Sequence, residues 1–155
     1  MKQHQGLRHG DTGMTLIELT VVLAVIAVLA TLAWPGFQEA IQRSRRSDAM
    51  VALAAISQAQ ERWRANNPSY QPALSKLPGA NSLVSAAEHY ALTVAEGSTN
   101  ASSYTAVATA KSTSPQFSDG RCREFRFLAE GGHIRYSSLT SANVVNASPD
   151  PCWVK

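Results

Sequence analysis

One long apolar segment without charge, Leu19 to Phe37, lies directly behind the motif Gly13-Met14-Thr15-Leu16-Ile17-Glu18. Most of its residues are Val, Leu, Ala and Ile, and Thr20 and Thr31 are minor polar interruptions. A helix of about 20 residues rises about 30 Å, which matches the hydrocarbon core of a bilayer. The segment therefore predicts a single membrane-spanning helix. A buried helix of a soluble protein is the alternative, but a chain of 155 residues has little else to surround one.

Glu18 is the unusual residue of this region, because a carboxylate at the edge of an apolar span is costly and needs a role and a partner. Cleavage between Gly13 and Met14 would create a positive amine on Met14, four residues before that carboxylate. The start of the span would then carry one charge of each sign.

The motif from Gly13 to Leu19 resembles the class III signal of type IV pilins and the related pseudopilins. In that family a prepilin peptidase cuts after the residue that matches Gly13, on the cytoplasmic face, and methylates the new amine on the residue that matches Met14. The glutamate that matches Glu18 pairs with the N-terminal amine of a neighbouring subunit during assembly. Pro35 matches the proline that kinks the helix of the family. Where this chain has Met14, Phe is the usual residue.

The resemblance implies that residues 1–13 are a leader peptide that is removed. This leader carries Lys2, Arg8 and Asp11, so its loss lowers the formal net charge from +3 to +2. The segment behind the apolar run contains no A-x-A signal for an ordinary secretory peptidase. Residues 14–37 are therefore expected to stay with the mature chain as the transmembrane and filament-core half of the helix.

The orientation in the membrane follows from the resemblance and not from the charges. Arginines at positions 43, 45 and 46 follow the span, so the positive-inside rule does not by itself place the N-terminus in the cytoplasm. The resemblance implies a single-pass inner-membrane protein with its head in the periplasm, which becomes part of an extracellular pilus after assembly.

Residues 38–66 predict the second, amphipathic half of the same helix, because they contain no Gly or Pro and their apolar residues recur at helical spacing. The helix is expected to stop at Asn66-Asn67-Pro68, since the residue before a proline avoids helical geometry. The predicted buried stripe consists of Ile41, Ala49, Leu53, Ile56, Ala59 or Gln60, and Trp63.

Residues 67–155 predict a small α+β head. Residues 67–88 are read as a connecting loop with one short helix near Ser82 to Ala87. Alternating residues then predict an antiparallel pair of strands at 90–94 and 104–108. A second pair, at 123–128 and 134–136, flanks the hairpin signal Glu130-Gly131-Gly132. Together with the long helix, this order is expected to produce the type IV pilin fold.

The two cysteines, Cys122 and Cys152, are expected to form a disulfide, because a periplasmic head folds in an oxidising compartment. The bridge would bound the region 122–152. This arrangement resembles the D-region of type IV pilins, where a disulfide ties the C-terminal segment to the sheet. It counts against the major pseudopilins of type II secretion, which typically lack the bridge.

No catalytic or metal-binding constellation is recognisable, and no cofactor is expected. His4 and His9 belong to the leader, while His89 and His133 stand apart without metal-like spacing and are predicted to be solvated. No Ser or Thr lies in a nucleophile-elbow pattern. An enzyme is therefore not expected.

Four arginines of the head, Arg121, Arg123, Arg126 and Arg135, form a candidate basic face, with Lys155 near it through Cys152. Some pilins of this type bind DNA through phosphate contacts of that kind. The alternative is a solvated sheet face that Glu124 and Glu130 partly neutralise.

The resemblance implies a structural subunit of a type IV pilus that assembles through its N-terminal helix. The ending Pro151-Cys152-Trp153 looks like the minor pilins called pilin E, so a minor pilin is the preferred prediction. A major pilin, a DNA-uptake receptor pilin and a type II secretion pseudopilin are the alternatives. The implied partners are other pilin subunits, the prepilin peptidase, the inner-membrane assembly platform, the inner membrane itself before assembly, and DNA.

Overall fold

The computed structural model describes residues 14–82 and 88–153. The chain divides into two compact units at Glu39 and Ala40, and each is described here by itself. Three predictions lie wholly or mostly outside the described residues: the leader with Gly13, the helix from Ser82 to Ala87, and Lys155. The three described residues that precede the gap at 83–87, residues 80–82, are helical.

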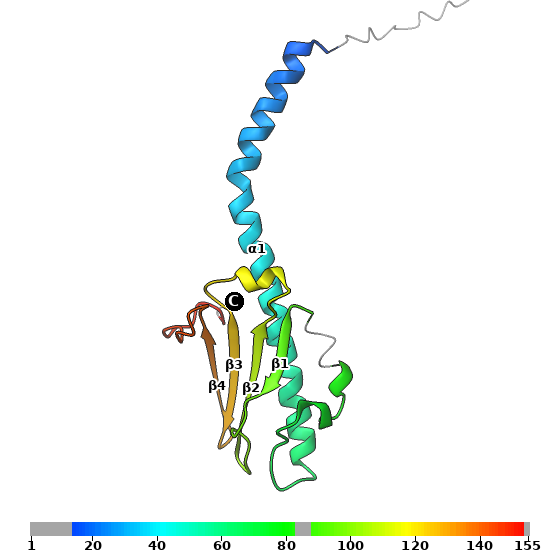
Figure 1. The fold of residues 1–155 in the computed structure, drawn as a ribbon, viewed down its shortest axis with the longest axis vertical. Coiled ribbons are helices and arrows are strands. Elements are labelled where there is room, and N and C mark those ends of the chain that lie inside the picture. Colours follow the sequence, from blue (N-terminus) through cyan, green and yellow to red (C-terminus); the bar gives the residue numbers. More distant parts are fainter. Residues whose placement is uncertain (1–13, 83–87, 154–155) are drawn as a thin grey trace, which may run out of the picture. The chain divides into compact units, whose positions relative to one another are not determined.

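A single long helix, α1, runs from Leu16 to Arg64 (Figure 1). The sequence predicted its end at Asn66, two residues later. The Asn67 side chain closes the last turn, because its Nδ2 donates a hydrogen bond of 2.8 Å to the Trp63 carbonyl. That bond satisfies one of the carbonyl groups that a helix leaves unpaired at its C-terminus.

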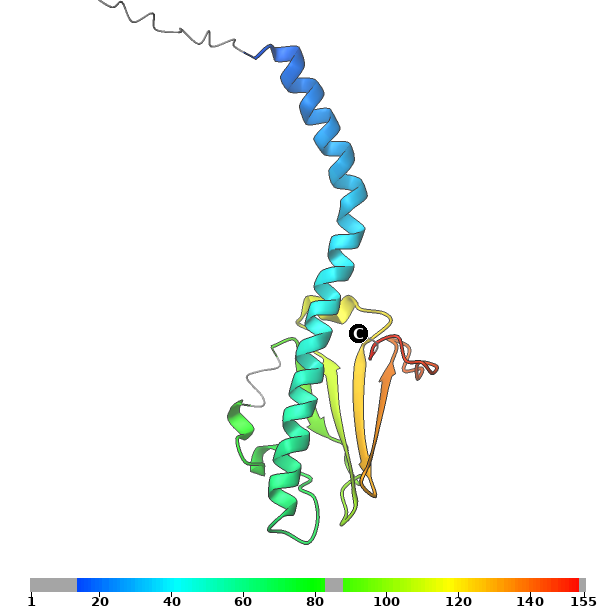
Figure 2. The same ribbon diagram turned by 180° about the vertical axis from the view of Figure 1, so that it is seen from behind.

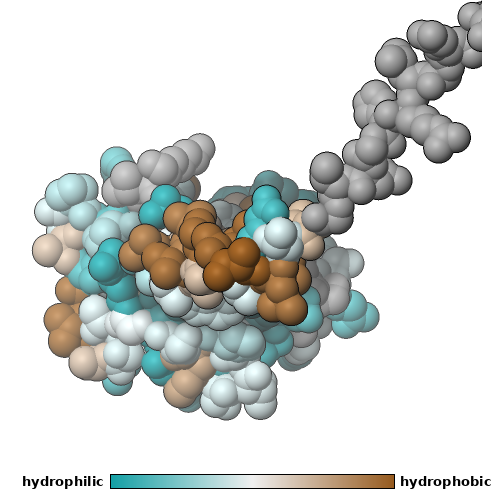
Figure 3. All heavy atoms as spheres, turned by 90° about the horizontal axis from the view of Figure 1, so that it is seen from above, coloured by the Kyte–Doolittle hydropathy of each residue, from teal (hydrophilic) through white to brown (hydrophobic). Residues whose placement is uncertain are grey.

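In the N-terminal unit, every described residue from Met14 to Glu39 is exposed. Among the described residues, α1 is the one helix that is long and apolar enough to cross a membrane. The hydroxyls of Thr20 and Thr31 donate to carbonyls three residues earlier, at 2.8 and 2.7 Å, so their polar groups are satisfied inside the helix. Apolar side chains gather where this end of α1 faces the viewer in Figure 3.

The second unit contains a four-stranded antiparallel sheet in the order β1-β2-β3-β4. Its strands are β1 (Tyr90–Val94), β2 (Ser103–Ala110), β3 (Glu124–Glu130) and β4 (His133–Leu139). The part of α1 in this unit lies across one face of the sheet and leaves the other open, as the two opposite views show (Figures 1 and 2). The predicted α+β pilin fold and its four strands are confirmed.

The turn between β3 and β4 consists of Gly131 and Gly132, with φ of 57° and 79°. Two successive residues with positive φ form the two-residue turn whose twist matches an antiparallel hairpin, and glycine adopts these angles without a steric penalty. The hairpin signal in the sequence therefore marked the turn correctly.

The core lies between α1 and the inner face of the sheet. On the helix, Ala49, Leu53 and Ile56 are fully buried at helical spacing, as predicted. The sheet contributes mainly aromatic side chains, namely Tyr90, Tyr104, Phe125 and Phe127. Ile41 and Trp63, predicted in the same stripe, are only half-buried, because they lie at the two ends of the helical segment of this unit.

Gln60 occupies the polar position of the buried stripe and holds the chain that follows the helix. Its side chain donates from Nε2 to the Gln71 carbonyl at 2.7 Å and accepts from the Gln71 N–H at 2.9 Å. Both polar ends of a fully buried amide are thereby satisfied, so Gln60 fits the core in spite of its polarity. Two short 3-10 helices, η1 (Leu74–Lys76) and η2 (Pro115–Ser118), were not predicted.

Candidate functional site

The first turn of α1 presents the residues of the predicted assembly site. Met14 is 70% exposed, and the Glu18 N–H donates to Thr15 Oγ1 at 3.3 Å, which caps the helix. Within the described residues, no hydrogen bond or ion pair involves the Glu18 carboxylate. The carboxylate is thus free to accept a cation from outside the chain.

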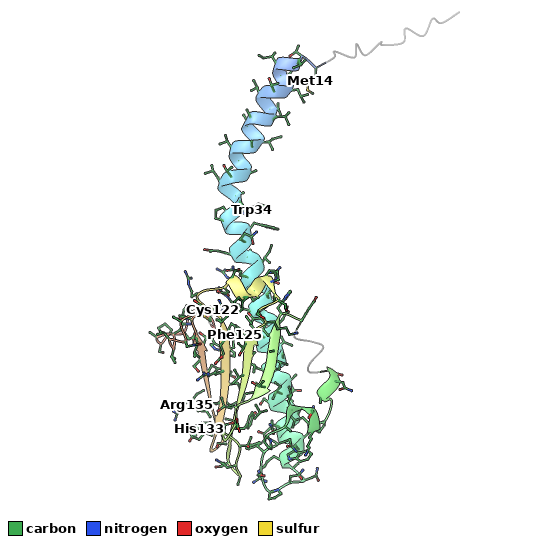
Figure 4. All side chains as sticks on the ribbon, viewed as in Figure 1. Met14, Trp34, Cys122, Phe125, His133 and Arg135 are labelled. Carbon is green, nitrogen blue, oxygen red and sulfur yellow. A yellow bond between two sulfur atoms is a disulfide. The ribbon has the colours of Figure 1, made fainter. Side chains whose placement is uncertain are left out.

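Pro35 lies inside α1, where its ring removes the N–H that would bond to the Thr31 carbonyl. The Thr31 hydroxyl bonds to the Val28 carbonyl and does not replace that donor. A kink at Pro35 remains a prediction. Trp34, beside it, is 63% exposed. Figure 4 labels Trp34 in this part of the helix and Met14 at the start of the described chain.

The predicted disulfide between Cys122 and Cys152 is present, with an S–S distance of 2.01 Å and 5.8 Å between the Cα atoms. It joins the chain just before β3 to the C-terminal segment, and both cysteines are buried. The same segment is held by Ser138, whose hydroxyl lies 2.7 Å from Asp150 Oδ1, and by Trp153, whose Nε1 donates to the Ser137 carbonyl at 2.9 Å.

Asp119, which the sequence analysis did not single out, forms the most connected polar site of the head. Its carboxylate accepts two bonds from the Arg46 guanidinium, at 2.7 and 3.0 Å, and one from Gln116 Nε2 at 2.9 Å. The N–H groups of Arg121 and Cys122 donate to it as well. Asp119 thus joins α1 to the loop that carries the disulfide. No spacing rule links residues 73 positions apart, so the sequence contained no signal for the pair.

The four predicted arginines do not form one continuous face. Arg126 and Arg135 lie on the open face of the sheet, on β3 and β4, where Glu124 pairs with Arg126 at 2.6 Å and Glu130 with Arg135 at 3.9 Å. Arg135 is the freer of the two, since its side chain is 74% exposed.

The other two arginines lie just before the first residue of β3, close to Arg126 along the chain and at the end of the strand away from Arg135. Figure 4 shows this separation, with Cys122 at one end of the sheet and Arg135 near the other. The Arg123 guanidinium lies 3.7 Å from the centre of the Phe117 ring, a cation-π contact. Arg121 is exposed and, in the described residues, its guanidinium has no hydrogen bond or ion pair.

A groove of about 740 Å³ lies in the head between α1 and the C-terminal segment. Arg43, Arg46 and Met50 line it from α1, Arg121 from the loop before β3, and Trp153 from the C-terminal segment. Ser47, Pro149, Pro151 and Cys152 complete the lining, which contains no acidic residue. The sequence analysis did not find this groove, because its walls come from three distant segments.

The histidines of the head behave differently from each other. His133 is exposed, as predicted, but His89 is half-buried, and its Nδ1 lies 2.9 Å from Ser114 Oγ. The prediction that His89 is solvated is therefore wrong, because the loop before η2 folds back over it. In residues 14–82 and 88–153, no group of three His, Cys, Asp or Glu side chains is placed to hold a metal ion.

In the described residues, the largest changes of pKa are those of two buried tyrosines of the core. Burial raises the pKa of Tyr104 to about 12 and also raises the pKa of Tyr90. Both phenols are neutral at physiological pH and lie in the core, where the charges of Asp119 and Arg46 also act on Tyr90. They are structural groups and not a candidate reactive centre.

Comparison with known families matched two family models to adjoining parts of the chain. The model described as "Type IV minor pilin ComP, DNA uptake sequence receptor" matches residues 35–126. The model of the prokaryotic N-terminal methylation motif matches residues 8–34. No curated protein and no solved structure matched the chain.

Proposed function

This chain belongs to the type IV minor pilin ComP family, and we propose that it reaches the pilus through three steps. The prepilin peptidase cuts after Gly13 and methylates the amine of Met14. The apolar part of α1 then anchors the subunit in the inner membrane, with the head in the periplasm. The inner-membrane assembly platform finally transfers it into a filament of other pilin subunits, which carries it outside the cell.

The observation that supports this route is the complete exposure of the apolar half of α1. Large apolar side chains such as Ile17, Leu23 and Leu32 are between 56% and 74% exposed. An apolar surface of this extent needs a covering, which lipid supplies before assembly and packed helices supply in a filament. The proposed role is structural and includes no chemical turnover.

In this proposal the charge of Glu18 stabilises the docked subunit relative to the free one. A pair between Glu18 and the Met14 amine of the same chain would stabilise the free and the docked subunit equally, so it could not favour docking. The methylated amine of the neighbouring subunit becomes available only when the subunit docks. Pairing with it would both attract the incoming subunit and set its axial register.

Glu18→Gln tests this step, because it removes the charge and keeps the shape. We expect leader cleavage and membrane insertion to remain, while the ratio of sheared-pilus protein to membrane-bound protein falls. Glu39→Gln is the matched control, since Glu39 is an exposed acid on the same helix beyond the apolar segment. Normal incorporation of the Glu18 variant would show that the pair is dispensable. Loss of cleavage would instead assign Glu18 to peptidase recognition.

DNA binding by the head is the second proposed function, because the matched family is described as a DNA uptake sequence receptor. The four arginines at positions 121, 123, 126 and 135 are the proposed phosphate contacts. The seven residues of β3 extend about 23 Å. A duplex lying along this strand would present about seven phosphates per strand over that length, at about 3.4 Å each. It could thus reach arginines at both ends of the sheet.

We rank these proposed contacts by how few partners each guanidinium has within the protein. Arg121 and Arg135 are expected to contribute most. The Arg121 guanidinium is exposed and has no ion pair in the described residues, and the pair of Arg135 with Glu130 is long and solvated, whereas Arg126 is held closely by Glu124. Arg135→Ala should weaken DNA retardation by the full-length chain and lower the slope of log K against log salt by about 1. Arg62→Ala, at an exposed arginine in the last turn of α1, is the control and should change neither. Retardation that does not depend on salt would contradict a phosphate-based mode.

A further inference from the structure

The groove between α1 and the C-terminal segment contains charge that the protein does not neutralise. Of its three arginines, Arg46 is bound to Asp119 through two hydrogen bonds. Neither the Arg43 nor the Arg121 guanidinium has a hydrogen bond or ion pair in the described part of the chain. The groove thus presents two free guanidinium groups on a scaffold that a third arginine holds in place.

Two acids of the segments that form the groove are already used by other groups. Asp119 accepts from Arg46, Gln116 and two backbone N–H groups. Asp150 lies between two prolines of the lining, but its carboxylate is bound to the Ser138 hydroxyl and accepts from the Cys152 N–H. Neither acid is free to approach Arg43 or Arg121. The exposed acids Glu39 and Asp48 of α1 form no ion pair with an arginine in the described residues. A ligand that neutralises this groove would therefore bring its own negative charge.

The chemistry of the lining favours a phosphate attached to an apolar body. Arginine binds phosphate oxygens with two parallel hydrogen bonds, which makes it the preferred side chain for this group. Met50 and Trp153 add apolar surface beside the arginines. The Trp153 ring is fixed in place, because it packs against Phe125 and Tyr136 at centroid distances of 5.5 and 4.7 Å.

The chain itself holds this groove close to a source of such ligands. Arg43 follows Phe37, the last apolar residue of the predicted span, by six residues. Even a fully extended chain of six residues reaches only about 20 Å. A groove tethered at this distance meets lipid headgroups at a high effective concentration before any partner subunit arrives.

We propose that this groove binds the headgroup phosphate of an anionic phospholipid while the subunit is anchored in the membrane. Arg43 and Arg121 bind the phosphate, and Met50 and Trp153 contact the glycerol and upper acyl carbons. This inference rests on the membrane anchoring proposed above. It gives the head a defined contact with the bilayer surface before assembly and a site that must be vacated when the subunit enters the filament.

Photo-crosslinking in lipid nanodiscs tests the site with the full mature chain. The chain is reconstituted in phosphatidylcholine that contains a photoreactive phosphatidylglycerol or, in a parallel sample, a photoreactive phosphatidylcholine. The labelled peptides are then mapped by mass spectrometry. We expect both lipids to label residues 14–37, whereas peptides that contain residues 149–153 are labelled by phosphatidylglycerol and lose that labelling when Arg43 and Arg121 are both changed to Ser. Arg62→Ser removes an exposed charge elsewhere on α1 and should leave the labelling intact.

The outcomes separate the groove from the anchor. Absence of labelling in residues 14–37 would refute membrane anchoring itself. Two results would refute a specific anionic site even if residues 14–37 are labelled. One is that phosphatidylglycerol and phosphatidylcholine label residues 149–153 equally. The other is that Arg62→Ser lowers the labelling of 149–153 as much as the double Arg43 and Arg121 variant does. Loss of the C-terminal labelling on adding inorganic phosphate, at a concentration equal to that of the lipid phosphate, would assign the groove to free phosphate. No labelling of 149–153 in nanodiscs, together with crosslinks from this segment to a neighbouring subunit in filaments, would assign it to assembly.

Discussion

Removing the Asp119 carboxylate should destabilise the head more than any other single change at a polar residue of its surface loops. The Asp119 side chain is only 2% exposed and the Arg46 side chain 14%, so Asp119→Ala leaves a largely buried guanidinium without its partner. Removing one member of a buried pair typically costs about 3–5 kcal/mol. The variant also deprives Gln116 and two backbone N–H groups of their acceptor.

This loss is large compared with the stability of a domain of this size. Folded domains are stable by about 5–15 kcal/mol, so the variant would lose about a fifth or more of the total. For a head of roughly 100 residues, about 4 °C per kcal/mol converts the loss into a decrease in Tm of about 12–20 °C. Thermal unfolding of the mature chain in detergent, followed by near-ultraviolet circular dichroism with the disulfide intact, measures it.

Substitution of the other partner, Arg46, should lower the unfolding free energy by less than Asp119→Ala does. This difference tests the reasoning more strictly than the size of either loss. Arg46→Met removes two hydrogen bonds from Asp119 but leaves it three other donors, so the expected loss is about 1–3 kcal/mol. Arg46 has no other hydrogen-bond partner in the described residues. Asp48→Ala, at an exposed acid two residues further along α1, is the control and should be nearly neutral. An Arg46→Met loss equal to or greater than that of Asp119→Ala would refute the view that the carboxylate is the centre of the site.

Two further predictions concern the disulfide and the core. The bridge closes a loop with a sequence separation of 30, so replacing Cys122 and Cys152 by Ser should cost about 3.5–4 kcal/mol, measured as the difference in unfolding free energy from the oxidised chain. Burial raises the pKa of Tyr104 to about 12 from its usual value of about 10, so the neutral phenol favours the folded state. That stabilisation is complete below pH 10 and is lost as the pH rises from 10 through 12. Tyr104→Phe should therefore flatten the decline of Tm over that range, and an unchanged slope would contradict the assignment.

The elements that sequence predicted best are those with a local, repeated signal. Residues 19–37 are apolar without interruption by charge, and the stripe that contains Ala49, Leu53 and Ile56 has helical spacing, so α1 was predicted to within two residues at its end. The Gly131-Gly132 pair marked a hairpin because few other residues adopt its backbone angles. These patterns report on backbone geometry alone and need no knowledge of the partner elements.

What the sequence could not reveal depends on the meeting of distant segments. In the sequence, Arg46 is one of three arginines that follow the apolar span. Its partner Asp119 lies 73 residues further along the chain, and only the fold brings the two together. The four arginines of the head looked like one basic face because they are close in sequence. Arg126 and Arg135 share the open face, because Arg126 pairs with Ser137 and Arg135 with Leu128 in the β3–β4 register. Arg121 and Arg123 precede β3 and therefore lie at the end of the strand away from Arg135.

The C-terminal segment connects the stability of the head to the binding that we infer for it. The ComP family match ends at residue 126, before β4 and this segment. The described part of the segment after Leu139 contains no strand or helix. It is held by the disulfide, by Asp150 at Ser138, by Trp153 Nε1 at the Ser137 carbonyl, and by bonds of Asn146 to the Ser138 and Arg121 carbonyls. These same contacts place Trp153 and the two prolines along the groove. Reduction of the bridge should therefore loosen the wall of the groove that Trp153 forms, because the disulfide is the covalent link between this segment and the chain before β3. Lipid contact should then weaken together with the stability of the fold, because both cysteines belong to the buried core. An oxidising compartment thus supports the inferred binding as well as the fold.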